Sequence, residues 1–129
     1  MRALLDTHAF LWFNANDSRL SITAMDFISN GQNDVFLSAA SVWEIAIKYS
    51  RGRLPEMDES PHAYVPSRIA QYGFAALPIE ITHALQVALL PQLHRDPFDR
   101  ILVAQAQVEG IPILTSDANI ARYDVEVIW

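Results

Sequence analysis

Four acidic residues occupy positions where a parallel β-sheet would bring them together. Asp6 directly follows the first apolar segment of the chain, and Asp117 follows a later one, ILTS. Glu44 and Asp99 each lie in the first half of a segment with helical character. In open parallel sheets, functional groups collect at the carboxyl ends of the strands. We therefore expect these four carboxylates to converge at one edge of a sheet.

Such a cluster suits one kind of chemistry. Several carboxylates in a partly buried site repel one another, and some of them protonate unless a cation neutralises them. The sequence contains no cysteine, and all-oxygen ligation favours Mg²⁺, with Mn²⁺ as the alternative. The corresponding reaction is hydrolysis of a phosphodiester, with water as the nucleophile and the ion stabilising the developing charge.

The segment HRDPFDR (94–100) contains two aspartates with different expected roles. Proline is favoured at the first position of a helix, so Pro97 predicts a helix start and makes Asp96 its N-cap. Asp99 instead heads the apolar helix face that continues through Leu102, Val103 and Ala106. An unpaired charge at the rim of a core is costly, so Asp99 needs a partner.

Each acid also has an ordinary structural interpretation. Asp6 could cap the helix that follows it. Glu44 stands four residues before Lys48, the favourable order for a surface ion pair, and three after Ser41, the spacing of a capping box. Asp117 could belong to a turn. Taken singly these alternatives stay open, but they do not explain why four acids share the same kind of position.

The chain alternates short apolar segments with helical ones. This pattern predicts an α/β fold with a mostly parallel central sheet of about five strands, covered on both faces. Strands are expected at 2–5, 35–37, 74–79, 111–116 and 125–129. Helices are expected at 7–13, 21–29, 39–50, 83–90, 97–109 and 119–122, with another from Ser60-Pro61 that Pro66 kinks or divides in two.

Composition limits the class of protein. The 129 residues, 51% of them hydrophobic, predict a single domain over 1–129. No apolar run is long enough for a membrane span, and Asp6 and His8 interrupt the apolar N-terminus, so we expect neither a membrane segment nor a signal peptide. The absence of cysteine is compatible with a reducing cytoplasm. A net charge of −6 excludes a broad basic surface, which leaves a few candidate contacts for a polyanion: Lys48, Arg51, Arg53, Arg95 and Arg100.

The histidines and aromatic residues carry less information. His8, His62, His83 and His94 fit no zinc-binding pattern and are expected to be ordinary structural residues. Trp12, Phe13 and Trp43 could stack on nucleic-acid bases. We expect them instead in the core or at a protein interface.

The sequence resembles the PIN-domain family, and within it the VapC-type toxin ribonucleases of toxin–antitoxin pairs. The matching segments follow the family's order over almost the whole chain: LLDTHAFLW (4–12), LSAASVWEIAIK (37–48), GFAALPI (73–79), HRDPFDRILVAQA (94–106) and ILTSD (113–117). The resemblance implies a PIN-like three-layer α/β/α sandwich. It also implies a catalytic quartet formed by Asp6, Glu44, Asp99 and Asp117.

The same resemblance implies roles for these residues. Asp6, Asp99 and Asp117 would bind Mg²⁺, and Glu44 would orient or deprotonate the attacking water or bind metal. The protein would be a cytoplasmic, homodimeric endoribonuclease toxin that cuts structured cellular RNA, tRNA or rRNA, and that a VapB-type antitoxin inhibits. The alternative is a PIN-like module that binds RNA or protein without cutting. Thr7, Ser38, Thr115 and Ser116 are expected around the site.

Overall fold

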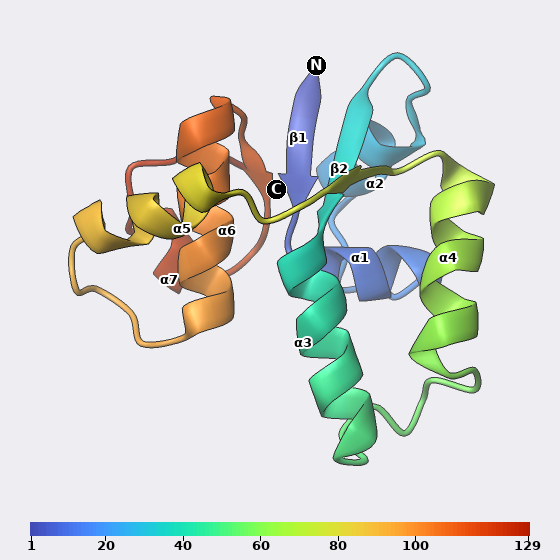
Figure 1. Cartoon of the computed structure of the whole chain (residues 1–129). Coiled ribbons are helices and arrows are strands. Elements are labelled where there is room, and N and C mark those ends of the chain that lie inside the picture. Colours follow the sequence, from blue (N-terminus) through green and yellow to red (C-terminus); the bar gives the residue numbers. More distant parts are fainter.

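Five parallel strands form one sheet with the spatial order β3-β2-β1-β4-β5 (Figure 1). The computed structural model describes all residues 1–129. The strands are β1 (Arg2–Leu5), β2 (Asp34–Ser38), β3 (Ala75–Leu77), β4 (Ile113–Leu114) and β5 (Val127–Ile128). Every neighbouring pair is parallel, which confirms the predicted parallel sheet of about five strands.

Helices connect the strands. They are α1 (Thr7–Asn14), α2 (Ile22–Ser29), α3 (Ala39–Ser50), α4 (Pro61–Tyr72), α5 (Ile81–Gln86), α6 (Pro97–Glu109) and α7 (Ala118–Ala121), with a 3₁₀ turn η1 (Val87–Leu89) after α5. In Figure 1, α1, α2 and α4 lie on one side of the sheet and α5, α6 and α7 on the other. None of the helices combines the length and the apolarity that crossing a bilayer requires.

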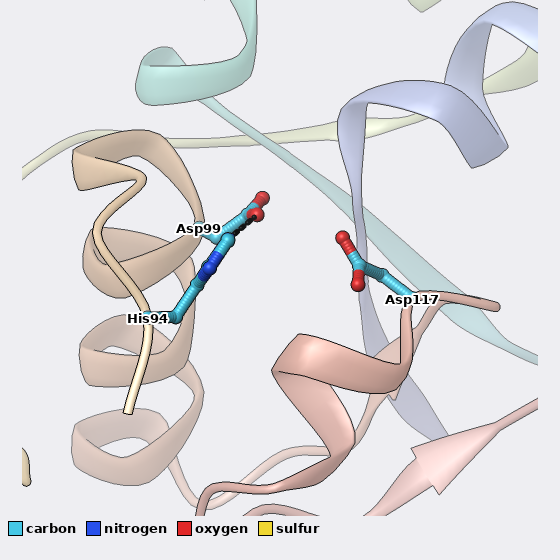
Figure 2. A group of neighbouring side chains, drawn as sticks. All are labelled: His94, Asp99 and Asp117. Atoms are coloured by element: carbon cyan, nitrogen blue, oxygen red, sulfur yellow. Dashed lines mark hydrogen bonds and ion pairs between the residues drawn. The ribbon is translucent and has the colours of Figure 1, made fainter. Parts of the chain in front are cut away.

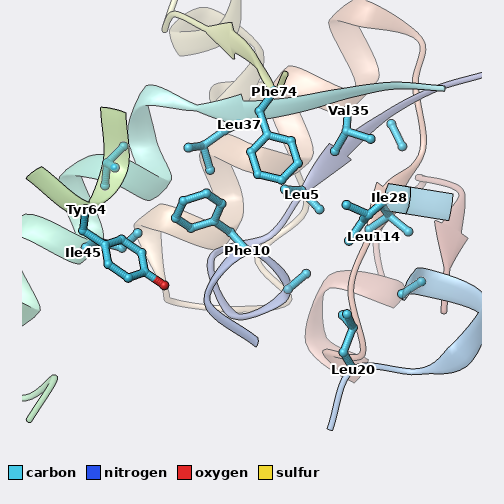
Figure 3. Close-up of a cluster of buried hydrophobic side chains, with 14 residues drawn as sticks. Leu5, Phe10, Leu20, Ile28, Val35, Leu37, Ile45, Tyr64, Phe74 and Leu114 are labelled. Carbon is cyan, nitrogen blue, oxygen red and sulfur yellow. The ribbon is translucent and has the colours of Figure 1, made fainter. Parts of the chain in front are cut away.

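Successive side chains of the central strand β1 face two different hydrophobic cores. Ala3 and Leu5 of β1 belong to a cluster that also includes Phe10 of α1 and Phe74, whereas Leu4 faces a second cluster built mainly on α6 (Figure 3). All three β1 residues are fully buried. Because successive strand residues point to opposite faces, a strand covered on both sides is apolar throughout. The predicted three-layer α/β/α arrangement is confirmed.

Local signals set the ends of the principal helices. Ser21 and Ser38 accept hydrogen bonds from the backbone amides of Ala24 and Ala40, both at 3.0 Å. These side chains satisfy amides that have no partner within the helix. Gly110 ends α6 with φ = 65°, a left-handed conformation that glycine adopts without steric cost. The expected starts of α2 and α3 and the expected end of α6 are confirmed.

A buried polar network joins the two helices that carry Glu44 and Asp99. The hydroxyl of Ser38, at the start of α3, donates to Oε1 of Gln105 on α6 at 2.6 Å. Nε2 of Gln105 in turn donates to the carbonyl of Pro78 at 3.2 Å. Ser38 and Gln105 are both inaccessible to solvent. Since leaving one of these polar groups unpaired costs about 1–3 kcal/mol, the network fixes α3 against α6.

The structure differs from the sequence-based expectation in five elements. Residues 61–72 form one helix that continues through Pro66, so a division into two helices is wrong. The strands β3, β4 and β5 are shorter than expected. Helix α5 begins at Ile81, two residues before the expected start at residue 83, because the backbone amide of Glu80 donates to Nδ1 of His83 at 2.9 Å in a capping box. A capping box that uses Glu and His lacks the Ser or Thr that usually marks this motif.

The N-cap of α6 gives a stability prediction. Oδ1 of Asp96 accepts from the amides of Phe98 and Asp99 at 2.9 and 3.4 Å. Asp96→Ala should lower the free energy of unfolding by about 1 kcal/mol, measured by urea denaturation at pH 5. At that pH repulsion between positions 96 and 99 does not contribute, because burial raises the pKa of Asp99 to about 7. The exposed Asp58 is the control: an equal loss in Asp58→Ala would contradict the capping role.

Candidate metal centre

The register of the sheet places Asp6 beside the segment that leads to Asp117. Leu5 of β1 pairs with Leu114 of β4, so Asp6 and Thr115 come next to each other where the two strands end. The hydroxyl of Thr115 donates to Oδ2 of Asp6 and accepts from the backbone amide of Asp117 at 3.0 Å. The strand order reverses between β1 and β4, and such switch points are where open α/β sheets bind ligands.

Asp6 is a buried carboxyl group. It is 4% exposed, and its Oδ1 accepts from the amide of Ala9 at 2.6 Å, so it caps α1 as one interpretation predicted. Burial raises the pKa of Asp6 above its usual range, although the hydrogen bonds from Thr115 and Ala9 and the nearby His8 lower it. Loss of hydration therefore outweighs the hydrogen bonds, and the charged form of Asp6 gains from any nearby cation.

Three further side chains meet in front of this edge. Figure 2 shows the carboxylates of Asp99 and Asp117 directed toward the same space, with His94 alongside Asp99. Potential ligand atoms of these three residues all lie within 4.8 Å of one another. Nε2 of His94 is 2.9 Å from Oδ2 of Asp99, which supplies the partner that Asp99 was expected to need. Asp117 also caps α7, because its Oδ1 accepts from the amide of Asn119 at 2.8 Å.

The pKa of Asp99 reflects both its burial and the neighbouring carboxylates. Burial, followed by repulsion from Asp96, raises the pKa of Asp99 to about 7, and the charges of Asp117 and Glu44 act in the same direction. The hydrogen bond with His94 lowers this pKa but does not compensate. Near neutral pH the carboxyl group of Asp99 is therefore partly protonated. A divalent cation bound there would displace the proton.

Glu44 is held by two neighbours. The residue is 6% exposed, Oε1 accepts from the hydroxyl of Thr7 at 2.6 Å, and Oε2 lies 2.7 Å from Nζ of Lys48. The expected ion pair with Lys48 is therefore present, although Glu44 is buried and not at the surface. The capping box with Ser41 is wrong, because Ser38 caps the helix and the buried hydroxyl of Ser41 has no partner.

The donor set fits a hard divalent ion. Oδ1 of Asp99 and Oδ2 of Asp117 make no hydrogen bond, so one oxygen of each carboxylate is available. Both oxygens of Asp6 accept hydrogen bonds, and both oxygens of Glu44 have partners. The structure thus brings Asp99 and Asp117 together most closely, joins Asp6 to them through Thr115, and keeps Glu44 within electrostatic range of Asp99.

Two site residues were misjudged from the sequence. His94 was expected to be an ordinary residue, yet it lies two positions before the N-cap of α6 and folds back onto Asp99, the third residue of that helix. Only this short spacing could have indicated the contact. Arg100 was considered a contact for a polyanion, but it is 8% exposed and donates to the carbonyl of Pro91 and the hydroxyl of Tyr123.

Two of the four small polar residues expected around the site form hydrogen bonds with the acids. Thr7 and Thr115 contact Glu44 and Asp6, as described above. Ser38 instead caps α3 and contacts Gln105. Ser116 is exposed and makes no side-chain hydrogen bond. Thr7 and Thr115 therefore orient the buried acids Glu44 and Asp6.

Removal of the charge at position 99 should stabilise the metal-free protein, and more at pH 8 than at pH 5. The pKa of Asp99 is raised from 3.8 to about 7 on folding, so the folded state retains a proton that the unfolded state releases. The free energy of unfolding of the parent protein therefore falls as pH rises between about 4 and 7. Asp99→Asn lacks this loss, because asparagine does not ionise.

The measurement is the melting temperature in EDTA at both pH values. Asp58→Asn, at an exposed position, should follow the pH dependence of the parent. If Asp99→Asn and the parent protein differed in melting temperature by the same amount at pH 5 and at pH 8, the charge of Asp99 would not be what destabilises the folded protein.

Comparison with known proteins agrees with this architecture. The family model described as PIN domain matches residues 3–126. Ribonuclease VapC16 of Mycobacterium tuberculosis is 41% identical over 56 residues, which are 43% of this chain; the match spans only 39% of that protein's length.

Solved structures share the fold at low sequence identity. VapBC2 of Rickettsia felis, bound to a DNA fragment from its promoter, has a TM-score of 0.70 at 11% identity, covering 98% of this chain and 97% of that one. FitAcB of Neisseria gonorrhoeae has a TM-score of 0.68 at 20% identity, covering 98% and 96%. A toxin–antitoxin complex of Klebsiella pneumoniae has a TM-score of 0.52 at 18% identity, covering 89% and 86%. Because the family model matches nearly the whole sequence, the resemblance noted above is confirmed, and the chain belongs to the PIN domain family.

Proposed function

We propose that the protein is a Mg²⁺-dependent endoribonuclease, with Mn²⁺ as a possible substitute, that hydrolyses phosphodiester bonds in structured cellular RNA such as tRNA or rRNA. The observation that carries this proposal is the convergence of Asp99 and Asp117 within 4.8 Å, beside His94, in surroundings that raise the pKa of Asp99 to about 7. Membership of the PIN domain family and the partial match to a ribonuclease support it.

The proposed roles of the acids follow from their contacts. Asp6, Asp99 and Asp117 are the proposed metal ligands. Asp99 and Asp117 each offer an oxygen without a hydrogen bond, and each oxygen of Asp6 accepts one hydrogen bond and keeps a second lone pair. A divalent ion bound there would lower the pKa of water and stabilise the negative charge that develops on the phosphate. Glu44, fixed by Thr7 and Lys48, accepts the proton of the attacking water at its carboxylate. His94 holds the carboxylate of Asp99 in orientation.

The acidic residues also favour an enzyme over the alternative, a module that only binds RNA or protein. A binding module gains nothing from buried carboxylates that repel each other and the RNA backbone. All four acids are present here, and Asp6 and Glu44 are buried despite the cost of removing a charge from water. Retention of such a costly group of side chains favours catalysis.

The proposal extends to a protein inhibitor and to the compartment. The similar structure from Klebsiella pneumoniae is a toxin–antitoxin complex. We propose by analogy that this chain is a toxin inhibited by a cognate VapB-type antitoxin. Its site of action is the cytoplasm, where cellular RNA is found.

The cleavage test compares two neighbouring aspartates. Asp99→Asn should abolish cleavage of total RNA in Mg²⁺, because it removes a ligand and the charge that attracts the ion. Asp96→Asn should retain cleavage within about threefold, because asparagine is an equally good N-cap and keeps the first turn of α6 in place. The measurement is the initial rate on gels, with sequencing of the RNA ends to identify substrate and cut site.

Metal dependence has its own control. EDTA should stop cleavage by the parent protein, and added Mg²⁺ or Mn²⁺ should restore it. Equal cleavage with and without EDTA would exclude the metal mechanism, and RNA binding without cleavage at any metal concentration would favour the binding module.

The proposal includes a homodimer. Ile81, Leu85 and Leu89 follow one another at four-residue spacing along α5 and η1 and are 79%, 68% and 77% exposed. A continuous row of exposed apolar side chains is typical of a protein–protein interface. Light scattering should give the mass of a dimer, and Leu85→Glu should give a monomer. Ile22→Glu, at an isolated residue that is 82% exposed, should leave the dimer intact; a dimer in both variants would place the interface elsewhere.

A further inference from the structure

Of the two positions expected for Trp43, the core and a protein interface, the structure rules out the core. Trp43 on α3 is 59% exposed, whereas Trp12 and Trp129 pack against the first core cluster. The indole of Trp43 contacts the ring of Phe98 on α6, with centroids 5.1 Å apart and planes at 78°. A perpendicular contact of this kind covers at most one side of an indole. Much of the Trp43 ring therefore faces solvent.

Each of the two aromatic residues is a sequence neighbour of an acid of the site. Trp43 directly precedes Glu44 on α3, and Phe98 directly precedes Asp99 on α6. The contact between these two rings joins α3 to α6, and Asp99 lies within electrostatic range of Glu44. The exposed indole thus borders the space in which the scissile phosphate would bind.

The charge of the protein limits how RNA can be held there. The net charge is −6, Lys48 is paired with Glu44, and Arg100 is buried. Of the five candidate cations, only the exposed Arg51, Arg53 and Arg95 remain for phosphate contacts, which usually dominate affinity for nucleic acids. Stacking of a base on an aromatic ring needs no cation, and it can supply affinity next to acids that repel the backbone.

We propose that Trp43, supported by Phe98, is the stacking surface for one unpaired nucleobase adjacent to the phosphate that is cut. This inference rests on the proposed ribonuclease function. A paired base has stacking neighbours on both faces, so the substrate nucleotide must lie in a loop, a bulge or an end of the structured RNA. Every base has a π-face, so the contact selects unpaired structure and not sequence.

The first experiment compares a hairpin RNA that contains an unpaired loop with a fully paired duplex of the same sequence. The parent protein should cut the loop and leave the duplex intact. Trp43→Leu should raise KM for the hairpin by about 5- to 150-fold, the equivalent of roughly 1–3 kcal/mol. The kcat should stay within about twofold, because the stacked base binds equally in the ground state and the transition state. Trp43→Phe should restore most of the affinity.

Tyr49→Leu is the matched control. Tyr49 is an exposed aromatic residue on the same helix, 38% exposed and six residues beyond Trp43. This variant should keep the KM of the parent protein. Circular dichroism melting of all the variants separates loss of folding from loss of stacking, and Trp43→Phe provides an aromatic variant if Trp43→Leu proves unstable.

A second experiment locates the base. Abasic nucleotides are placed one at a time around the mapped cut site of the hairpin. One position should raise KM for the parent protein and have no further effect on Trp43→Leu, because the variant has already lost that contact. Independent, additive losses at every position would overturn the stacking contact.

The outcomes distinguish this inference from the proposed function. If the parent protein cuts no RNA in Mg²⁺, the ribonuclease proposal fails and the inference fails with it. If the parent protein cuts the hairpin and Trp43→Leu keeps its KM, or if the parent cuts the duplex equally well, only the stacking inference fails. If Trp43→Leu alters the mass of the assembly and leaves KM unchanged, the exposed ring is a protein interface.

Discussion

The cost of burying carboxylates, increased by their mutual repulsion, is the constraint on which the site depends. Two like charges about 4 Å apart repel by about 4 kcal/mol at the effective dielectric of a protein surface. Asp99 shows the consequence, because burial and the surrounding acids raise its pKa to about 7. A fold that must hold such groups together cannot rely on the site itself for stability. The stability has to come from the two apolar cores that anchor the strands and helices behind it.

The parallel sheet provides the necessary rigidity with short strands. Only two pairs of residues align β1 with β4, yet this register brings Asp6 level with Thr115 and places Asp117 just beyond. One threonine hydroxyl then contacts both acidic segments, as a donor to Asp6 and as an acceptor from the amide of Asp117. On the other side of β1, Ser38 and Gln105 fix α3 against α6. The site is therefore positioned by polar contacts between elements that the cores have already brought together.

Much of the fold was predictable because its signals are local. Asp96-Pro97 marks the start of α6, Gly110 marks its end, and the alternation in β1 marks a strand buried on both faces. The convergence of the acids followed from topology, since carboxyl ends of parallel strands share one edge. The contact between His94 and Asp99 was not predictable in the same way, because it depends on how a loop folds back. Nor does spacing indicate that Arg100 turns inward to the hydroxyl of Tyr123.

The acids also show why a capping interpretation and a catalytic one are hard to separate from sequence. A carboxylate has two oxygens, and a helix that starts at the edge of a sheet engages only one of them with its free amides. Asp117 caps α7 with Oδ1 and keeps Oδ2 free toward Asp99. Asp96 also caps with one oxygen, because Oδ1 accepts from both amides of α6, but it lies outside the group formed by His94, Asp99 and Asp117. Capping therefore orients a functional carboxylate as readily as a structural one, and only the direction of the second oxygen distinguishes them.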